Sequence, residues 1–342
     1  MTDSPDSKGV DIDGLVAWLA EVVDPSISSA TVTKLAGGHS SGAWRIDVSG
    51  TGLHLALVLK APEGPSVVYR RDVCQEGRVL DALNRAGAPV PVVVAIDAVE
   101  QAIGRPCFVM ELVEGRSPAD SSVAGYHDDP WLHEVGPVAQ RAMWSSFYDS
   151  LAALHTVDAA QLTDASHGQN GSVDVIGYWR ESLLDVAPAE TVPRQVAVLD
   201  WLVANLPADA DDCPALCMGD ARFVNCLIDG AEVRALIDFE VAYLGNPAAD
   251  IGYSTFLEAQ QLQNAQHPLP GIGGADEAWS RWATATGRDA THRHYWTAFG
   301  AMVIVITASR AMVQWGLAGP SLDSDNPLVA VWEDLAARAA GQ

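Results

Sequence analysis

The chain of 342 residues is long enough for one large hydrophobic core or for two lobes, and 49% of its residues are hydrophobic, as in globular proteins. The formal net charge of −24 argues against a nucleic-acid groove or an anionic membrane surface as the partner. This charge is compatible with a cationic small molecule, although acid spread along the whole chain favours a general solubilising cause.

Five cysteines at irregular spacing match neither a disulfide framework nor a tetrahedral metal site, so we expect buried thiols in a reducing compartment. The acidic residues 1–10 lack an apolar core, which predicts a disordered lead rather than a signal peptide. The most apolar run, 298–308, is too short to span a bilayer. Together these features predict a cytoplasmic protein that binds no membrane. We further expect a monomer or a homodimer.

The sequence pattern of the first third of the chain predicts mainly strands, with two helices. Residues 11–23 carry apolar side chains at helical spacing and predict a short amphipathic helix, and a second helix is expected at 68–86. Strands are expected at 30–36, 44–48, 53–59, 92–96 and 107–112. After Gly115 the pattern turns helical, with helices expected at 138–158, 178–184, 195–205 and from 279 onward. We therefore predict one lobe at 1–113 and a second at 114–342.

A glycine-rich turn, residues 37–42, separates the first two expected strands. Glycine permits close approach of a ligand, so backbone N–H groups around Gly38, Ser40 and Ser41 can lie over phosphates. An ordinary Gly-Ser hairpin turn explains the same residues and stays open as the alternative.

Lys60 ends the apolar run 53–59 in a chain that has only three lysines. A compact ammonium with three donors at the end of a buried strand suits the bridging of phosphate oxygens. The alternative is a lysine that reaches solvent from a strand end.

The segment 217–240 carries the strongest signal. It predicts a hairpin with strands at 225–228 and 232–237, joined by Asp229-Gly230. A hairpin brings its outer ends together, so Asn225 and Asp238 can aim oxygens at one point, which suits Mg²⁺ shared with phosphates. Asp220, just before, can orient and deprotonate a hydroxyl nucleophile. Polar residues that merely end two strands are the alternative.

These motifs resemble the catalytic core of the aminoglycoside phosphotransferase family, small-molecule relatives of the protein kinases. The matching residues are Met218-Gly219-Asp220, Asn225, Ile237-Asp238-Phe239-Glu240, Gly245-Asn246-Pro247 and Asp250. The departure is Met218, where most members carry His, and this residue is the main support for a catalytically silent protein.

The resemblance implies an α+β, protein-kinase-like fold of two lobes, a small antiparallel β-sheet lobe and a larger, mostly helical lobe. It implies Asp220 as the catalytic base, Asn225 and Asp238 as ligands of Mg²⁺, and Lys60 as a phosphate ligand. The family's matching glutamate, which pairs with this lysine, corresponds to Glu76, with Asp72 as the fallback.

Further positions follow from the same resemblance. The backbone of Glu111 and Val113 would meet the adenine edge, although an edge strand leaving the sheet fits these residues as well. Gly38, Ser40 and Ser41 match the family's nucleotide loop in position. His155 and Asp250 are expected to be structural, and Asp250 is also expected to open a helix as an N-cap-like acid. Apart from the resemblance, Arg310 interrupts the apolar segment 295–312 and is expected to contact a carboxylate, either in a structural role or in the acceptor pocket.

The implied reaction moves the γ-phosphoryl group of ATP to a hydroxyl of a small molecule, aminoglycoside-like or another amino alcohol or sugar. The identity of this acceptor is not readable from the sequence. The alternative is a catalytically silent nucleotide-binding pseudokinase or scaffold. A hydrolase is disfavoured because the sequence has no nucleophile elbow and no cluster of metal ligands.

Overall fold

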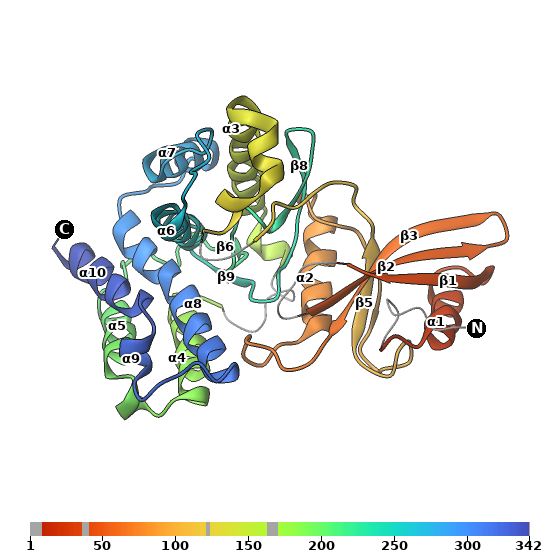
Figure 1. The fold of residues 1–342 in the computed structure, drawn as a ribbon, viewed down its shortest axis with the longest axis horizontal. Helices are drawn as coiled ribbons and strands as arrows, with labels where there is room; N and C mark the ends of the chain where they lie inside the picture. The colour runs from red at the N-terminus through yellow and green to blue at the C-terminus, as the bar shows by residue number, and fades with distance from the viewer. Residues whose placement is uncertain (1–8, 36–40, 121–123, 163–169, 342) are drawn as a thin grey trace.

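The computed structural model describes residues 9–35, 41–120, 124–162 and 170–341. Its first part is a five-stranded antiparallel sheet in the order β1-β2-β3-β5-β4 (Figure 1). The strands are β1 (Ile27–Lys34), β2 (Ser41–Gly50), β3 (Leu53–Pro62), β4 (Val93–Asp97) and β5 (Cys107–Glu111). All five strands were predicted from the sequence, and their bounds shift by a few residues.

The two faces of this sheet are covered by different helices. Because side chains alternate along a strand, Cys107 and Val109 belong to one cluster of buried residues and Phe108 to another. The first cluster includes helix α1 (Ile12–Val22), and the second includes helix α2 (Val73–Arg85). The second cluster continues into the rest of the chain, so α2 lies between the sheet and the helical part (Figure 1).

The second part of the chain is mostly helical, with two small two-stranded sheets. Its helices are α3 (Pro130–His155), α4 (Ser172–Val186), α5 (Pro193–Ala204), α6 (Ala248–Asn264), α7 (Ala275–Thr286), α8 (Arg293–Gln314), α9 (Leu322–Asp325) and α10 (Leu328–Ala340). Short 3₁₀ turns occur at Tyr126–Asp128, Ala159–Gln161 and Ala189–Thr191. The small sheets pair β6 (Ala215–Cys217) with β9 (Tyr243–Gly245), and β7 (Cys226–Asp229) with β8 (Glu232–Leu236).

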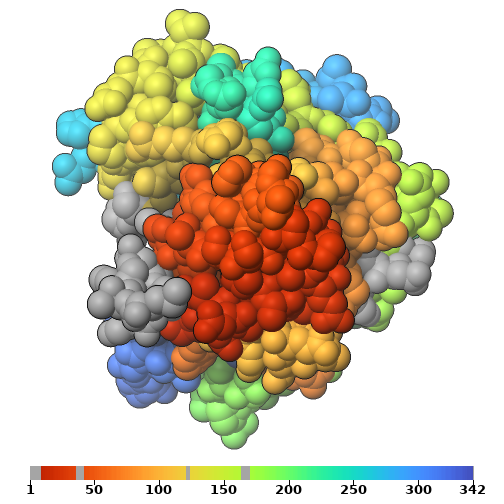
Figure 2. Space-filling model, turned by 90° about the vertical axis from the view of Figure 1, so that its right-hand side faces the viewer, coloured from red at the N-terminus to blue at the C-terminus, as the bar shows by residue number. Residues whose placement is uncertain are grey.

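The β7–β8 hairpin lies against α3 beside the larger sheet. Figure 2 shows the first strands in red across the front of the molecule, with α3 in yellow and the hairpin in green next to each other above them. This α+β arrangement is the predicted fold class. The boundary between lobes at 113 and 114 stays a prediction.

Helix α8 is long and apolar enough to cross a membrane by length and composition alone. Most of it is buried inside the fold, where it packs against α6, α10 and α4. Burial at the centre of the helical part therefore accounts for its apolar character.

Several predicted boundaries are wrong, and capping and pairing explain them. Helix α2 begins at Val73 rather than 68 because the Asp72 carboxylate caps its first turn. The hairpin turn is Gly230-Ala231, since Asp229 pairs with Glu232. The predicted disordered lead lies almost entirely outside the described residues.

Two boundaries in the helical part also differ from the prediction. Helix α3 begins at Pro130, ahead of the predicted 138, and a residue in the left-handed region, Gly136, kinks it. Asp250 lies in the first turn of α6 and not at its cap, because the helix already begins at Ala248.

Helices α6 and α8 approach each other closely at Gly300. A Cβ atom at this position would lie 2.3 Å from the backbone nitrogen of Tyr253 and 2.7 Å from the carbonyl oxygen of Ala249. Both neighbours are backbone atoms, so only a shift of one helix would accommodate a side chain.

We predict that Gly300→Ala lowers the melting temperature by about 1–4 °C, because overpacking costs about 1–3 kcal/mol. Gly177→Ala in α4 is the matched control, since a Cβ there meets nothing within 4 Å. That change is expected to keep or raise the melting temperature, because alanine is the better helix former. Thermal unfolding followed by circular dichroism measures both, and equal melting temperatures would contradict the close packing.

Candidate active site

The segment between β6 and β7 carries Asp220 and lies against the segment that follows β8. Pairing of β6 with β9 places Cys217 opposite Tyr243, and the loop contacts Val241 at Gly219. Gly219 has φ +75°, and a Cβ there would lie 2.5 Å from the Val241 carbonyl oxygen. Glycine is therefore required on both counts, by conformation and by space.

The Asp220 carboxylate is held from several directions. The Asn225 side-chain nitrogen donates to Asp220 Oδ2 at 3.0 Å and to the Asp220 carbonyl oxygen at 2.9 Å. The hydroxyl of Tyr253 donates to Oδ1, and Arg222 Nε lies 2.8 Å from the same oxygen as an ion pair. The Asp220 side chain keeps 18% of its surface exposed, so one part of it still faces solvent.

The hairpin brings Asn225 and Asp238 together, as the sequence predicts. The N–H of Ile237 donates to the Asn225 carbonyl oxygen at 3.0 Å, and Asp238 is the next residue, in the left-handed region with φ +69°. Because Asn225 Nδ2 makes both bonds to Asp220, its Oδ1 is the atom left for a metal ion. This donor set of one amide oxygen and one carboxylate fits Mg²⁺.

Lys60 lies between two carboxylates that come from different parts of the chain. Its Nζ donates to Glu76 Oε1 at 2.5 Å and to Asp238 Oδ1 at 2.8 Å. The structure thus places the predicted Lys60–Glu76 pair in direct contact across β3 and α2. Asp72, the fallback partner, instead caps α2.

The electrostatics of this group follow from burial and charge. Burial opposes the charge on Lys60, but Asp238, Glu76 and Glu240 outweigh it and raise the pKa of the ammonium. Burial raises the pKa of Glu76, whose side chain is only 1% exposed, and Lys60 offsets part of this effect. For Asp238, burial is opposed by Lys60, Arg222 and Arg71, which together hold the pKa of the carboxyl below its ordinary value.

The predicted adenine-binding backbone lies at the end of β5. The N–H of Glu111 donates to the Val92 carbonyl oxygen at 2.9 Å, and that of Leu112 to the Ala56 carbonyl oxygen at 3.1 Å. These two N–H groups therefore belong to the sheet. A nucleotide base at this edge would meet the carbonyl of Glu111 and the N–H of Val113, and their role stays a prediction.

The predicted phosphate loop is described only in part. Gly38 and Ser40 lie outside the described residues. Ser41 begins β2, and its backbone pairs with Pro62 in β3, while Ala43 pairs with Lys60. The loop therefore leads directly into the strand beside Lys60.

Asp250 and His155 brace the loop of Asp220. The carboxylate of Asp250 accepts from the N–H groups of Met218 at 2.7 Å and Gly219 at 3.0 Å, and His155 Nε2 lies 3.1 Å away from it. Trp282 Nε1 donates to His155 Nδ1 at 2.9 Å, which leaves the proton on Nε2 to bond Asp250. Residue 218 thus takes part through its backbone, whatever its side chain.

Three contacts of this site were not predicted from the sequence. They are the contacts of Tyr253 and Arg222 with Asp220, and the contact of Trp282 with His155. Tyr253 lies three residues after Asp250 in an expected helix, a spacing that places both on one face and could have indicated it. Arg222 and Trp282 carried no comparable signal in the sequence.

Arg310 contacts a carboxylate, as predicted, and its role is structural. Its guanidinium donates to Asp185 Oδ2 at 3.0 Å, to the Ser182 carbonyl oxygen at 2.6 Å and to the Val67 carbonyl oxygen at 2.7 Å. These bonds fasten the segment before α2 to helices α4 and α8.

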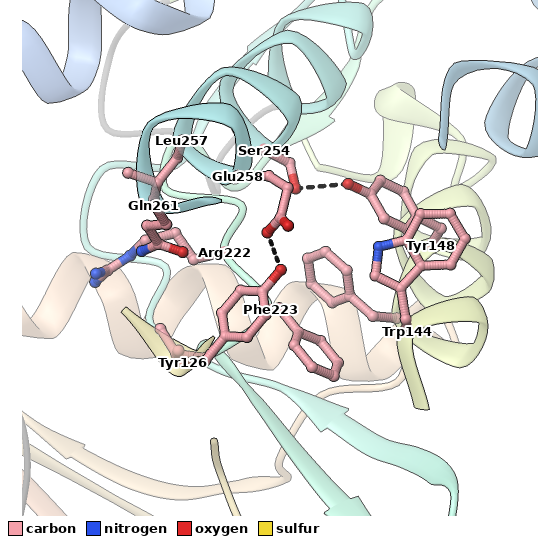
Figure 3. Close-up of a pocket in the computed structure, with 11 residues that line it drawn as sticks. Tyr126, Trp144, Tyr148, Arg222, Phe223, Ser254, Leu257, Glu258 and Gln261 are labelled. Atoms are coloured by element: carbon pink, nitrogen blue, oxygen red, sulfur yellow. Dashed lines mark hydrogen bonds between the residues drawn. The ribbon is translucent and has the colours of Figure 1, made fainter. Parts of the chain in front are cut away.

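A hollow lined by aromatic and polar side chains lies next to the loop of Asp220, between α3 and α6 (Figure 3). Arg222 and Phe223 of the loop form part of its wall. Glu258 of α6 accepts hydrogen bonds from Tyr126 and from His127, the latter at 3.0 Å. Across the hollow, the hydroxyls of Tyr148 and Ser254 are 2.9 Å apart.

Within the described parts of the chain, no three His, Cys, Asp or Glu side chains form a group that could hold a metal ion. Cys74, Cys107, Cys217 and Cys226 are buried free thiols, and Cys213 is exposed.

Lys60 of the antiparallel sheet and Glu76 of α2 form a buried pair, and Lys60 also contacts Asp238 after the hairpin. The loop that carries Asp220 lies in the same region. This arrangement defines a kinase-like phosphotransferase. The model of the phosphotransferase enzyme family matches residues 31–290, and the chain belongs to this family.

Among curated proteins, acyl-CoA dehydrogenase family member 11 of Gallus gallus is 31% identical over 230 residues, or 66% of this chain. Family member 10 of Mus musculus is 29% identical over 203 residues, or 58% of this chain. The matches cover 28% and 18% of these proteins, so the chain corresponds to less than a third of either.

Solved structures of phosphotransferases share the fold. A structure from Ralstonia eutropha JMP134, whose assignment as an aminoglycoside phosphotransferase is itself provisional, has a TM-score of 0.72 at 23% identity, covering 95% of this chain and 98% of that one. Aminoglycoside phosphotransferase APH(4)-Ia with AMP-PNP and hygromycin B has 0.60 at 14%, covering 96% and 99%. Macrolide 2′-phosphotransferase type I has 0.57 at 19%, also covering 96% and 99%.

We predict that Asp250→Asn destabilises the protein by about 1–3 kcal/mol, because an amide cannot accept all the buried bonds that the carboxylate accepts. Asp229→Asn, at an exposed position of the hairpin, is the matched control with the same change in charge. Thermal unfolding of the two variants measures the difference. Equal melting temperatures would show that Asp250 does not brace the loop.

Proposed function

We propose that the protein transfers the γ-phosphoryl group of ATP to a hydroxyl group of a small molecule. The observation that carries this proposal is the contact of Lys60 with Glu76 and Asp238 at once, next to the Asp220–Asn225 pair. A fixed ammonium, a carboxylate for a metal ion and a separate carboxylate for a proton are what phosphoryl transfer requires.

Each residue has a distinct task in this proposal. Lys60, held by Glu76, neutralises phosphate oxygens of the nucleotide. Asn225 Oδ1 and the Asp238 carboxylate hold Mg²⁺, which when bound neutralises charge on the phosphates. Asp220 orients the acceptor hydroxyl and takes its proton. The adenine would lie at Glu111 and Val113, with the loop of Gly38, Ser40 and Ser41 over the phosphates.

A nucleotide as co-substrate is further supported by the solved relatives, of which APH(4)-Ia has been captured with AMP-PNP. The pseudokinase alternative rests on Met218. Since the loop is braced through the backbone N–H groups of Met218 and Gly219, the side chain at 218 is not needed for this purpose. Bracing without the family His favours an active enzyme.

The acceptor is proposed by class only. The relatives of known structure bind hygromycin B or are named for macrolides, so amino sugars and macrolides belong in a panel of acceptors. The curated relatives are named for acyl-CoA chemistry, which supports a second candidate, a hydroxylated acyl-CoA thioester.

We expect Mg·ATP and one acceptor of the panel to release ADP, and Asp238→Asn to reduce this rate at least about 100-fold through loss of a metal ligand. ADP release in a coupled assay, with Asp229→Asn as the matched control, measures the effect. Asp238→Asn is a cleaner test than Lys60→Ala, because removing Lys60 leaves Glu76 buried without its cation.

Wild-type turnover by Asp238→Asn would refute the assignment of the site. If the wild-type protein releases no ADP with any acceptor of the panel while Mg·ATP still raises its melting temperature, this result would favour the pseudokinase. If there is no ADP release and Mg·ATP does not raise the melting temperature, nucleotide binding itself would be refuted.

A further inference from the structure

We propose that Tyr253 is a positioning residue, which fixes the carboxylate of Asp220 so that the acceptor hydroxyl meets its Oδ2 atom. This inference rests on the proposed function. It adds that Tyr253 of α6 positions Asp220, and that Asp220 Oδ2 is the oxygen that takes the proton.

The hydrogen bonds of Asp220 distinguish its two oxygens. Oδ1 accepts from the Tyr253 hydroxyl and also faces Arg222 Nε at 2.8 Å. Oδ2 accepts from Asn225 Nδ2 at 3.0 Å. A carboxylate oxygen accepts about two hydrogen bonds, so Oδ2 keeps room for one more donor, whereas Oδ1 is already surrounded.

Tyr253 contacts the loop from the same helix that braces its backbone. Asp250 and Tyr253 lie three residues apart in α6, so both point from one face toward the segment 218–220. Asp250 holds the backbone of that segment, and Tyr253 holds its reactive side chain. The helix therefore sets both the place of the loop and the rotation of the carboxylate.

Close packing behind Tyr253 keeps it in place. The side chain is buried, with 2% of its surface exposed, and the backbone nitrogen of Tyr253 faces Gly300 of α8. On the same helix, a Cβ at Gly252 would lie 2.1 Å from the Trp296 carbonyl oxygen. Two glycines thus let α6 and α8 meet at backbone distance, which leaves Tyr253 little freedom to move.

The Tyr253 hydroxyl donates a hydrogen bond to Asp220 near neutral pH. Burial, and then the nearby Asp220 carboxylate, raise the pKa of the Tyr253 hydroxyl well above its ordinary value. The phenol therefore keeps its proton and does not compete for that of the acceptor.

In the proposed step, the acceptor oxygen forms a bond to the γ-phosphorus while the bond between this phosphorus and the β,γ-bridging oxygen breaks. ADP leaves with that electron pair, and the acceptor's proton passes to Asp220 Oδ2. Rotation of the carboxylate would move Oδ2 away from the hydroxyl. Misplacement by about 1 Å costs about 100-fold in rate.

The kinetic test uses Tyr253→Phe in the full chain, with Mg·ATP and the first acceptor of the panel that the wild-type protein phosphorylates. We expect kcat to fall about 10-fold or more, with both KM values within about twofold of wild type. Tyr295→Phe is the matched control, because it removes a buried hydroxyl that donates to the Leu202 carbonyl oxygen instead. A smaller fall in kcat, or an equal fall in the control, overturns the proposal.

A second readout needs no acceptor and separates this proposal from the proposed function. Tyrosine labelled with ¹³C at Cζ reports the hydrogen bond of each of the seven tyrosines, and Tyr→Phe changes assign the signals. We expect Asp220→Asn to shift the Tyr253 signal and to leave that of Tyr295 in place. If Asp220→Asn leaves the Tyr253 signal unmoved, the proposal is overturned even where the wild-type protein is an active kinase. If no acceptor reacts, the proposed function fails, and the labelled signal still decides whether Tyr253 holds the carboxylate of Asp220.

Discussion

The site depends on one ammonium group held between two carboxylates of distant origin. Lys60 comes from β3, Glu76 from α2 and Asp238 from the segment after β8, 178 residues further along the chain. Removing such charges from water is costly, and their mutual attraction compensates only when all partners are in place. The contact therefore ties the geometry of the sheet to that of the hairpin, and a phosphate group would find its cation already positioned.

Helix α6 has a comparable role for the loop of Asp220. Its first turn carries Asp250, which accepts two backbone N–H groups of the loop, and Tyr253 follows one turn later. Because Asp250 braces the loop through the backbone N–H groups of Met218 and Gly219, this bracing does not depend on the side chain at 218. Packing of α6 on α8 then connects the loop of Asp220 to the core of the helical part.

Much of the site was predictable because its determinants are local. A two-strand hairpin joins its own ends, so Asn225 and Asp238 had to meet once β7 and β8 formed. Lys60 stood out as a rare lysine at the end of an apolar strand. By contrast, β6 and β9 were missed, because strands of three residues carry no periodic signal and form only through their pairing with each other.

By itself the sequence determined the order of strands and helices, the hairpin and the positions of the charged residues, since these follow from neighbours along the chain. Only the tertiary structure decided which side chains contact each other across separate elements. The Tyr253 hydroxyl on Asp220, the Trp282 indole on His155 and the place of Arg222 join residues on separate elements. Such contacts depend on how helices and strands pack in space, and packing is set by the whole core rather than by any local pattern.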